Sequence, residues 1–243
     1  MLNEPLITQL NTLGLRGMAH ALERQQRQQE VQTLDFDDRL AMLVQQEVVE
    51  RQNFRLSQRL RWAKLGQPAC VEDLDARTPR GIDRGRLAQL GELNWIAQRQ
   101  NLLITGPTGV GKSYIACALA HQACREDISV RYFRMPRLAE ELMRAAALQK
   151  RSLFFKQLAK ATLLVIDDFG LAPMSDEVKR DLLEIFDDRF DKTSTIVTSQ
   201  LPVERWHTWL NDPTLADAIL DRLVHNAHRL ALKGDSMRKK KIA

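Results

Sequence analysis

The 243-residue sequence has few cysteines, few aromatic residues and no long apolar run. Its 3 cysteines, Cys70, Cys117 and Cys124, match no spacing of a zinc site or of a disulfide framework. Cys117 and Cys124 are at positions i and i+7 of an expected helix and are interpreted as small core residues. A reducing compartment, the cytoplasm, is the simplest expectation. Neither a membrane-spanning segment nor a signal peptide is expected from the apolar pattern.

The composition is that of an ordinary globular protein. Apolar residues make up 44% and charged residues 28%, so the chain can bury a sizeable core without disulfides. The net charge of +5 and the sequence pI near 9.3 permit nucleic-acid binding without establishing it. Basic residues concentrate in two stretches, 51–64 and 229–243. The 5 histidines show no ligand spacing typical of a metal site.

The first part of the chain is expected to be all-helical. Apolar periodicity predicts helices over about 3–29 and 37–65, and Gly66 and Pro68 end the second one. Residues 69–86 are expected to be irregular and to form the junction with a second domain. We therefore expect a small helical N-terminal domain, residues 1–68, followed by a larger domain, residues 69–243.

The second domain alternates between expected strands and helices. Strands are predicted over 101–105, 128–133, 163–166 and 195–198. Helices are predicted over 86–98, 112–125, 136–160, 176–188, 203–210 and 215–227. Such alternation predicts the α/β class, with a central parallel sheet flanked by helices.

A phosphate-binding loop lies between the first of these strands and the helix that follows it. Its residues match the pattern G-x-x-x-x-G-K-[ST] at every fixed position: Gly106, Pro107, Thr108, Gly109, Val110, Gly111, Lys112 and Ser113. Glycines let the backbone amides point inward, and the following helix adds its N-terminal dipole. Lys112 is expected to reach the β- and γ-phosphates of ATP, and Ser113 to ligate Mg²⁺. Tyr114 comes next and is included among the expected nucleotide contacts.

Acidic residues follow the apolar strand Leu163–Ile166 directly. Ligands of open α/β sheets bind at the carboxyl edge of the sheet, which is where Asp167 and Asp168 are expected to lie. Asp167 is expected to hold the magnesium ion. Asp168 is the better candidate for the general base that activates water.

A second apolar strand, at 195–198, also has a polar end. Parallel strands end on one edge, so Ser199 and its neighbours are expected near the γ-phosphate. The motif alone leaves two interpretations equally open: a polar group that orients the attacking water, or a plain turn.

These motifs together resemble one family. Thr198-Ser199-Gln200-Leu201-Pro202, Asp221-Arg222-Leu223 and Gly234-Asp235-Ser236-Met237-Arg238 follow the loop and the acidic strand end in order. This order is similar to that of the IstB family of AAA+ ATPases, which help insertion sequences to transpose. It resembles DnaC-type helicase loaders in less detail.

The resemblance implies further roles. It implies that Arg222 is an arginine finger for a neighbouring subunit, that Ser199 is the first sensor and that Arg238 is the second sensor, which contacts phosphates in cis. From sequence alone, a surface ion pair with Asp217 or Asp221 is the better interpretation of Arg222. The family usually has Asp-Glu where this chain has Asp167-Asp168, so slow or partner-stimulated hydrolysis is expected.

The resemblance also implies duplex DNA, other copies of this chain and the transposase of the same element as partners. Five basic residues are candidate DNA contacts: Arg51, Arg55, Arg59, Lys150 and Arg151. Arg51, Arg55 and Arg59 share one helix face, although a solvated charged face is the better interpretation without the resemblance. Phe54 and Trp62 are expected in the core.

Three functions compete at this point. The first is a DNA-binding AAA+ regulator of transposition, and the second is a helicase loader. The third is a P-loop kinase or GTPase acting alone, against which the missing Asn-Lys-x-Asp motif and Arg222 both argue.

Overall fold

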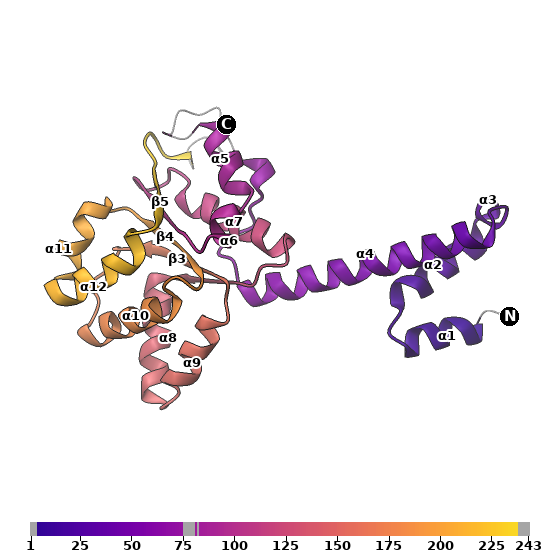
Figure 1. Ribbon diagram of the computed structural model, residues 1–243, viewed down its shortest axis with the longest axis horizontal. Coiled ribbons are helices and arrows are strands. Elements are labelled where there is room, and N and C mark those ends of the chain that lie inside the picture. The colour runs from indigo at the N-terminus through magenta and orange to yellow at the C-terminus, as the bar shows by residue number, and fades with distance from the viewer. Residues whose placement is uncertain (1–3, 75–80, 82, 238–243) are drawn as a thin grey trace. The chain divides into compact units, whose positions relative to one another are not determined.

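The computed structural model describes residues 4–74, 81 and 83–237 of the chain (Figure 1). The chain divides into two compact units, Met1–Gln58 and Arg59–Ala243, and the division falls within one long helix. No described helix has both the length and the apolar character needed to cross a membrane.

The N-terminal unit is helical, as expected. Its elements are α1 (Glu4–Thr12), α2 (Arg16–Arg27), α3 (Gln29–Gln32) and most of α4 (Phe36–Ala63). Its core is small and consists of buried Leu10, Ala19 and Leu22 with a few half-buried neighbours, Leu43 of α4 among them.

A close contact between α2 and α4 fixes this unit. A Cβ on Gly17 would lie 2.6 Å from the Cα of Glu47, so only glycine permits the approach. Burial opposes ionisation of Glu47, yet hydrogen bonds from Arg51 and from the amides of Met18 and Gly17 lower its pKa. Its carboxylate therefore satisfies amides in the first turn of α2, where no side-chain cap is present at Leu15.

The larger unit is built around a five-stranded sheet in the order β2-β3-β4-β1-β5, with every pairing parallel. The strands are β1 (Asn101–Thr105), β2 (Val130–Arg134), β3 (Leu163–Phe169), β4 (Ser194–Ser199) and β5 (Ala227–Ala231). The expected α/β class is confirmed.

Helices cover both faces of this sheet (Figure 1). Helix α7 (Lys112–Arg125) packs on one face. Side chains on the other face, such as Leu103, Leu164 and Val197, belong to one core with five helices. These are α8 (Met135–Ala147), α9 (Arg151–Ala159), α10 (Asp176–Arg189), α11 (Trp206–Leu210) and α12 (Pro213–Val224). The remaining elements are η1 (Val71–Asp73), α5 (Arg84–Gly91), α6 (Asn94–Ala97) and η2 (Val203–Arg205).

The sequence interpretation was wrong at several points. The strand β5 was missed, because its residues alternate poorly and it pairs only with β1 at the edge of the sheet. The helix expected over 86–98 is broken at Leu93, whose φ of 61° is left-handed. Phe54 and Trp62 are exposed by 61% and 43% instead of lying in the core.

Candidate functional site

The loop after β1 has the backbone of an anion site. Gly106, Gly109 and Gly111 have φ values of 147°, 83° and 103°, which side chains with a Cβ rarely adopt. Gly111 caps the N-terminus of α7, so the loop's amides and the helix dipole act at one place. Lys112 Nζ bonds to the carbonyls of Gly106 and Pro107 at 2.8 and 2.9 Å, which holds its ammonium inside the loop.

The segment after β5 closes over this loop. The amide of Leu232 donates to Thr105, the last residue of β1, at 2.7 Å, and the amide of Met237 donates to Gly109 at 2.9 Å. A Cβ on Gly109 would come within 2.2 Å of the Ser236 hydroxyl, so this packing requires glycine. Arg238, the expected second sensor, lies outside the described residues.

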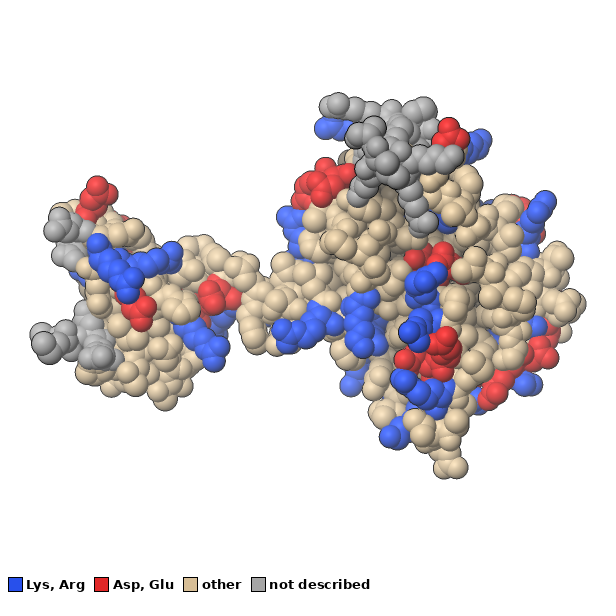
Figure 2. Space-filling model, turned by 180° about the vertical axis from the view of Figure 1, so that it is seen from behind, with Lys and Arg blue, Asp and Glu red and all other residues tan. Residues whose placement is uncertain are grey.

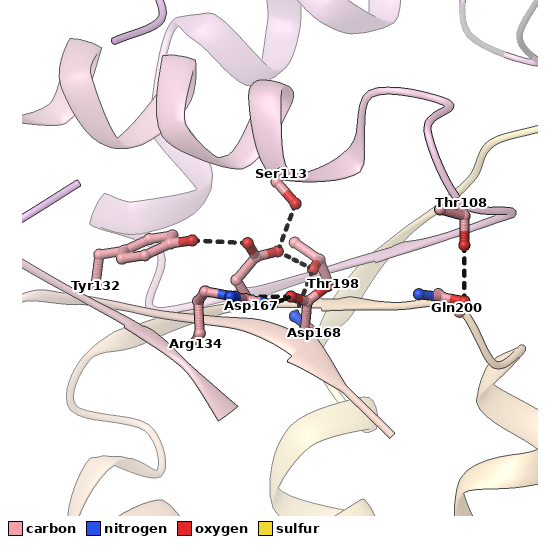
Figure 3. Close-up of polar contacts among 8 residues, drawn as sticks. All are labelled: Thr108, Ser113, Tyr132, Arg134, Asp167, Asp168, Thr198 and Gln200. Atoms are coloured by element: carbon pink, nitrogen blue, oxygen red, sulfur yellow. Dashed lines mark hydrogen bonds and ion pairs between the residues drawn. The ribbon is translucent and has the colours of Figure 1, made fainter. Parts of the chain in front are cut away.

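Asp167 is the centre of a hydrogen-bond cluster at the carboxyl edge of the sheet (Figure 3). Its Oδ1 accepts from Ser113 Oγ at 2.8 Å and from the hydroxyl of Thr198, and its Oδ2 accepts from Tyr132 Oη at 2.7 Å. Burial and the neighbouring Asp167 raise the pKa of Tyr132, so the phenol stays a donor. Three elements, α7, β2 and β4, thus orient one carboxylate that is 3% exposed.

The residues present fit a magnesium ion bound together with a nucleotide. Ser113 Oγ and a carboxylate oxygen of Asp167 are hard oxygen donors lying side by side at the loop, as Mg²⁺ requires. Among the described residues, no group of three His, Cys, Asp or Glu side chains could hold a metal by itself. The phosphates of a nucleotide would therefore have to supply further ligands.

A bulge in β3 separates the two acids. Ile166 pairs with Val197 but Phe169 pairs with Ser199, so β3 has one residue more than β4 here. Asp168 occupies this bulge with a φ of 62°, and its amide donates to Thr198 Oγ1 at 3.1 Å. As a result, its carboxylate points to the end of β2 instead of to Ser113 (Figure 3).

Arg134 holds that carboxylate. Its Nε and Nη2 donate to Asp168 Oδ2 at 3.0 and 2.8 Å. Hydrogen bonding to Asp168 raises the pKa of Arg134. The arginine side chain is 56% exposed, whereas that of Asp168 is 19% exposed. The pair therefore lies at the rim of the site, where a guanidinium can move.

The side chains of Ser199 and of its neighbour Gln200 point in different directions. The Ser199 hydroxyl is fully buried, donates to the carbonyl of Phe169 at 2.6 Å and accepts from the amide of Leu201. The exposed Gln200 reaches the phosphate loop, where its Oε1 accepts from Thr108 Oγ1 at 2.9 Å (Figure 3). Gln200 is thus the side chain of this strand end that faces the loop.

Sequence reasoning singled out none of four residues in the site: Tyr132, Arg134, Thr198 and Gln200. Thr198 and Gln200 belong to the polar strand end that was noticed, so the signal was present. Tyr132 and Arg134 lie on β2, whose pairing with β3 the sequence does not reveal.

Tyr114 lies beside the loop at the start of α7. Burial raises the pKa of its phenol, which bonds to the backbone of Cys70. The chain before the sheet is therefore packed against the residue that follows Ser113.

Arg222 lies at the opposite edge of the sheet. Its carbonyl accepts from the amide side chain of Asn101, the first residue of β1, at 3.1 Å, whereas the phosphate loop follows the last residue. Five strand residues at ~3.3 Å each separate the two edges by about 16 Å. Its guanidinium bonds to Asp187 at 2.7 Å and to Asp221 at 3.1 Å.

The candidate DNA contacts are spread over both units. Arg51 is paired with Glu47 at 2.7 Å, and Arg55 is exposed. Arg59 is paired with Asp127 and donates to the carbonyl of Cys124. Lys150 is exposed, whereas Arg151 is paired with Glu177 and with Asp181 at 3.3 Å.

Comparison with known proteins identifies the family. The family model for IstB-like ATP-binding proteins matches residues 8–243. The insertion sequence ATP-binding protein y4uH of Sinorhizobium fredii is 48% identical over 98% of this chain and 96% of its own length. The insertion sequence IS21 ATP-binding protein of Pseudomonas aeruginosa is 31% identical over 95% of this chain and 87% of its own.

Solved structures share the fold. DnaI is 22% identical, with a TM-score of 0.59 over 69% of this chain and 95% of that one. The DnaC helicase loader is 20% identical, with a TM-score of 0.54 over 68% and 97% of the two chains. The resemblance inferred from the motifs is confirmed: this chain belongs to the IstB-like ATP-binding proteins and is an AAA+ P-loop ATPase.

Proposed function

We propose that this protein is an ATP-dependent, DNA-binding regulator of transposition. In this proposal it assembles on duplex DNA as a homo-oligomer and recruits or stimulates the transposase of the same element. The observation that carries the proposal is its 48% identity, over 98% of the chain, to an insertion sequence ATP-binding protein. The free thiols of Cys70, Cys117 and Cys124 suit the reducing cytoplasm, where such a protein would act.

The loop and its acidic partner support ATP with Mg²⁺ as the bound species. Lys112 would bind the β- and γ-phosphates, and Ser113 and Asp167 would hold the ion. When bound, Mg²⁺ supplies positive charge that offsets the charge on the transferring phosphate. Tyr132 and Thr198 keep Asp167 oriented for this task, each through a hydrogen bond to a carboxylate oxygen.

Asp168 is proposed to accept the proton of the attacking water, and Gln200 to help hold that water at the loop. Asp168 accepts two hydrogen bonds from Arg134, and both are made to the same carboxylate oxygen, Oδ2. The guanidinium therefore has to turn away before Asp168 can act as a base on that side. This requirement fits slow basal hydrolysis.

Arg222 supports assembly of several copies. It lies about 16 Å along the sheet from the phosphate loop of its own chain, by the ~3.3 Å rise of each strand residue. Any γ-phosphate that it serves therefore belongs to another subunit. Its two aspartate partners are half-exposed or exposed, and such ion pairs are weak enough to exchange for a phosphate.

Assembly on DNA tests the proposal directly. The protein is mixed with duplex DNA and ATP, ADP or a non-hydrolysable ATP analogue, and its mass is followed by light scattering and electron microscopy. Large assemblies are expected only with DNA and the ATP forms. Arg222→Ala should keep nucleotide affinity while it lowers hydrolysis by the assembly on the order of a hundredfold or more. Arg180→Ala is the matched control, since Arg180 is an exposed arginine of the same unit.

The fold shared with DnaI and the DnaC helicase loader motivates a second candidate, a helicase loader. That candidate requires a stable complex with a replicative helicase ring in the absence of transposase. A helicase complex together with nucleotide-independent DNA binding would replace the first proposal by the second.

A further inference from the structure

A basic groove of about 510 Å³ lies beside the active site, at the end of β2 and along α8 and α9. Six cationic side chains line it: Lys64, Arg131, Arg134, Arg137, Arg144 and Lys150. Glu141 is the one acid among the described residues of the lining. Figure 2 shows basic side chains gathered in a column on one face of the larger unit, with fewer acidic side chains between them.

Arg131 gives this groove a fixed, buried positive charge. The residue is 8% exposed, and its guanidinium lies 4.5 Å from the ring centroid of Trp62 and 4.9 Å from that of Phe133. Its Nη1 donates to the carbonyl of Trp62 at 2.7 Å, while its buried Nε has no hydrogen-bond partner among the described residues. The charge of Glu141 acts on Arg131, but Glu141 forms its ion pair with Arg144. A buried cation without an ion pair is costly, and an anion in the groove would offset that cost.

Four of the other cations are available to an anion, whereas Arg134 is paired with Asp168. Lys64 and Lys150 have no ion pair in the described part of the chain. Arg137 and Arg144 pair with Glu140 and Glu141 on the surface of α8. Exposed pairs of this kind contribute little, so a phosphate can replace them at low cost. The groove thus offers positive charge along its length, which suits a repeating anion better than a single one.

We propose that this groove binds one phosphodiester strand of duplex DNA, an inference that rests on the proposed function and locates its DNA contact. Guanidinium forks match phosphate oxygens in a bidentate way, and each neutralised phosphate releases counterions. The aromatic faces favour duplex over single-stranded DNA. Proteins that bind single strands stack bases on exposed ring faces. Although Trp62 is 43% exposed, the guanidinium of Arg131 occupies one face of its ring and one face of the Phe133 ring.

Charge reversal in the groove tests the proposal. The double variant Arg137→Glu/Lys150→Glu is compared with Arg180→Glu/Lys192→Glu, which reverses one exposed arginine and one exposed lysine of the same unit outside the groove. Binding of a short fluorescent duplex is measured by anisotropy with a non-hydrolysable ATP analogue at several salt concentrations. The groove variant should bind on the order of tenfold or more weakly, and the log–log salt slope should fall by about 0.9 for each phosphate that the variant no longer neutralises. ATP affinity, which reports folding of the same unit, should be that of the wild type in both variants.

Each outcome has one meaning. If both double variants bind the duplex as tightly as the wild-type protein does, the groove assignment is wrong while the proposed function stands. If wild-type protein binds no duplex with any nucleotide, both fall. Two competitors in the same assay decide the class of ligand: single-stranded DNA, and an acidic peptide of equal charge. The assignment to a duplex strand is wrong if single-stranded DNA binds more tightly than the duplex in a groove-dependent way. It is also wrong if the acidic peptide displaces the duplex from this groove.

Discussion

The two units of this chain bury apolar surface to very different degrees. In the larger unit, the residues of the three inner strands β3, β4 and β1 that face the helices, such as Leu103 and Ile166, are fully buried. Among the described residues of the N-terminal unit, Phe36 and Leu13 are exposed by 74% and 72%, and the buried apolar residues are few: Leu10, Ala19, Ala21 and Leu22. The α/β unit therefore has a large core of its own, whereas the helical unit leaves much of its apolar surface exposed, and large exposed apolar patches are typical of surfaces that bind other molecules.

The units also differ in how they use polar groups. The N-terminal unit uses its buried carboxylate, Glu47, to hold helix amides together. The larger unit surrounds Asp167 with three donors and leaves it beside the phosphate loop. One acid therefore stabilises packing, while the other is oriented for a ligand.

Removal of the loop lysine should have the largest effect, and only on the larger unit. Lys112→Ala removes the ammonium that the loop carbonyls hold, so ATP affinity should fall on the order of a hundredfold or more. Fluorescent-nucleotide titration measures this, with circular dichroism to show that the helices remain. Lys192→Ala is the control, and unchanged ATP affinity of Lys112→Ala would refute the loop assignment.

Core truncation should separate the units by stability. Leu22→Ala should lower the free energy of unfolding of the N-terminal unit by about 2–3 kcal/mol, because Leu22 is 7% exposed in a small core. Phe54→Ala, at a side chain that is 61% exposed, should cost about 0.5 kcal/mol or less. Hydrogen exchange of residues 4–58 measures both. Loss of ATP binding in Leu22→Ala would show that the units do not act separately.

The sequence predicted the parts of the site that are local in the chain. The loop lies between a strand and a helix that are both continuous, so its glycines and Lys112 were recognisable from their pattern. The position of Asp167 and Asp168 could be predicted because they directly follow a buried strand, which must end at the sheet's edge. The α/β class could be predicted from the alternation of expected strands and helices.

Features that depend on pairing could not be predicted. The order of the strands places β2 beside β3, and only that pairing brings Tyr132 and Arg134 to the two acids. The bulge at Asp168 arises from a mismatch in register with β4. The strand β5 was missed because its apolar and polar residues alternate only weakly. Its strand conformation depends on hydrogen bonding to β1 rather than on the local sequence.

Removal of the Tyr132 hydroxyl should have a smaller effect than removal of Lys112 and should act through magnesium. Tyr132→Phe keeps the ring that Gly66 packs against but removes a donor to Asp167. A hydrogen bond to a charged group is worth about 1.5–3 kcal/mol, so the Mg²⁺ concentration for half-maximal hydrolysis should rise on the order of tenfold. ATP affinity in the presence of a chelator should stay as in the wild type. An unchanged Mg²⁺ dependence would show that Tyr132 does not position Asp167.

The smallest effect concerns two thiols on α7 and is confined to alkaline pH. Burial raises the pKa of Cys117 and of Cys124 to about 11, from a value of 9.0 for an exposed thiol. Between these values the folded chain binds more protons than the unfolded chain, so stability is fully present below pH 9 and falls as the pH rises toward 11. For Cys117 this decrease should reach about 2 kcal/mol near pH 10.5. Denaturant unfolding at pH 8 and near pH 10.5 measures this decrease in the wild type and in Cys117→Ala/Cys124→Ala. The free energy of unfolding of the double variant should depend less on pH.

The helical unit serves as the internal control, because it contains no cysteine. The stability of residues 4–58, measured by hydrogen exchange, should not show the same decrease with pH. An equal decrease there would mean that another group causes the alkaline loss of stability.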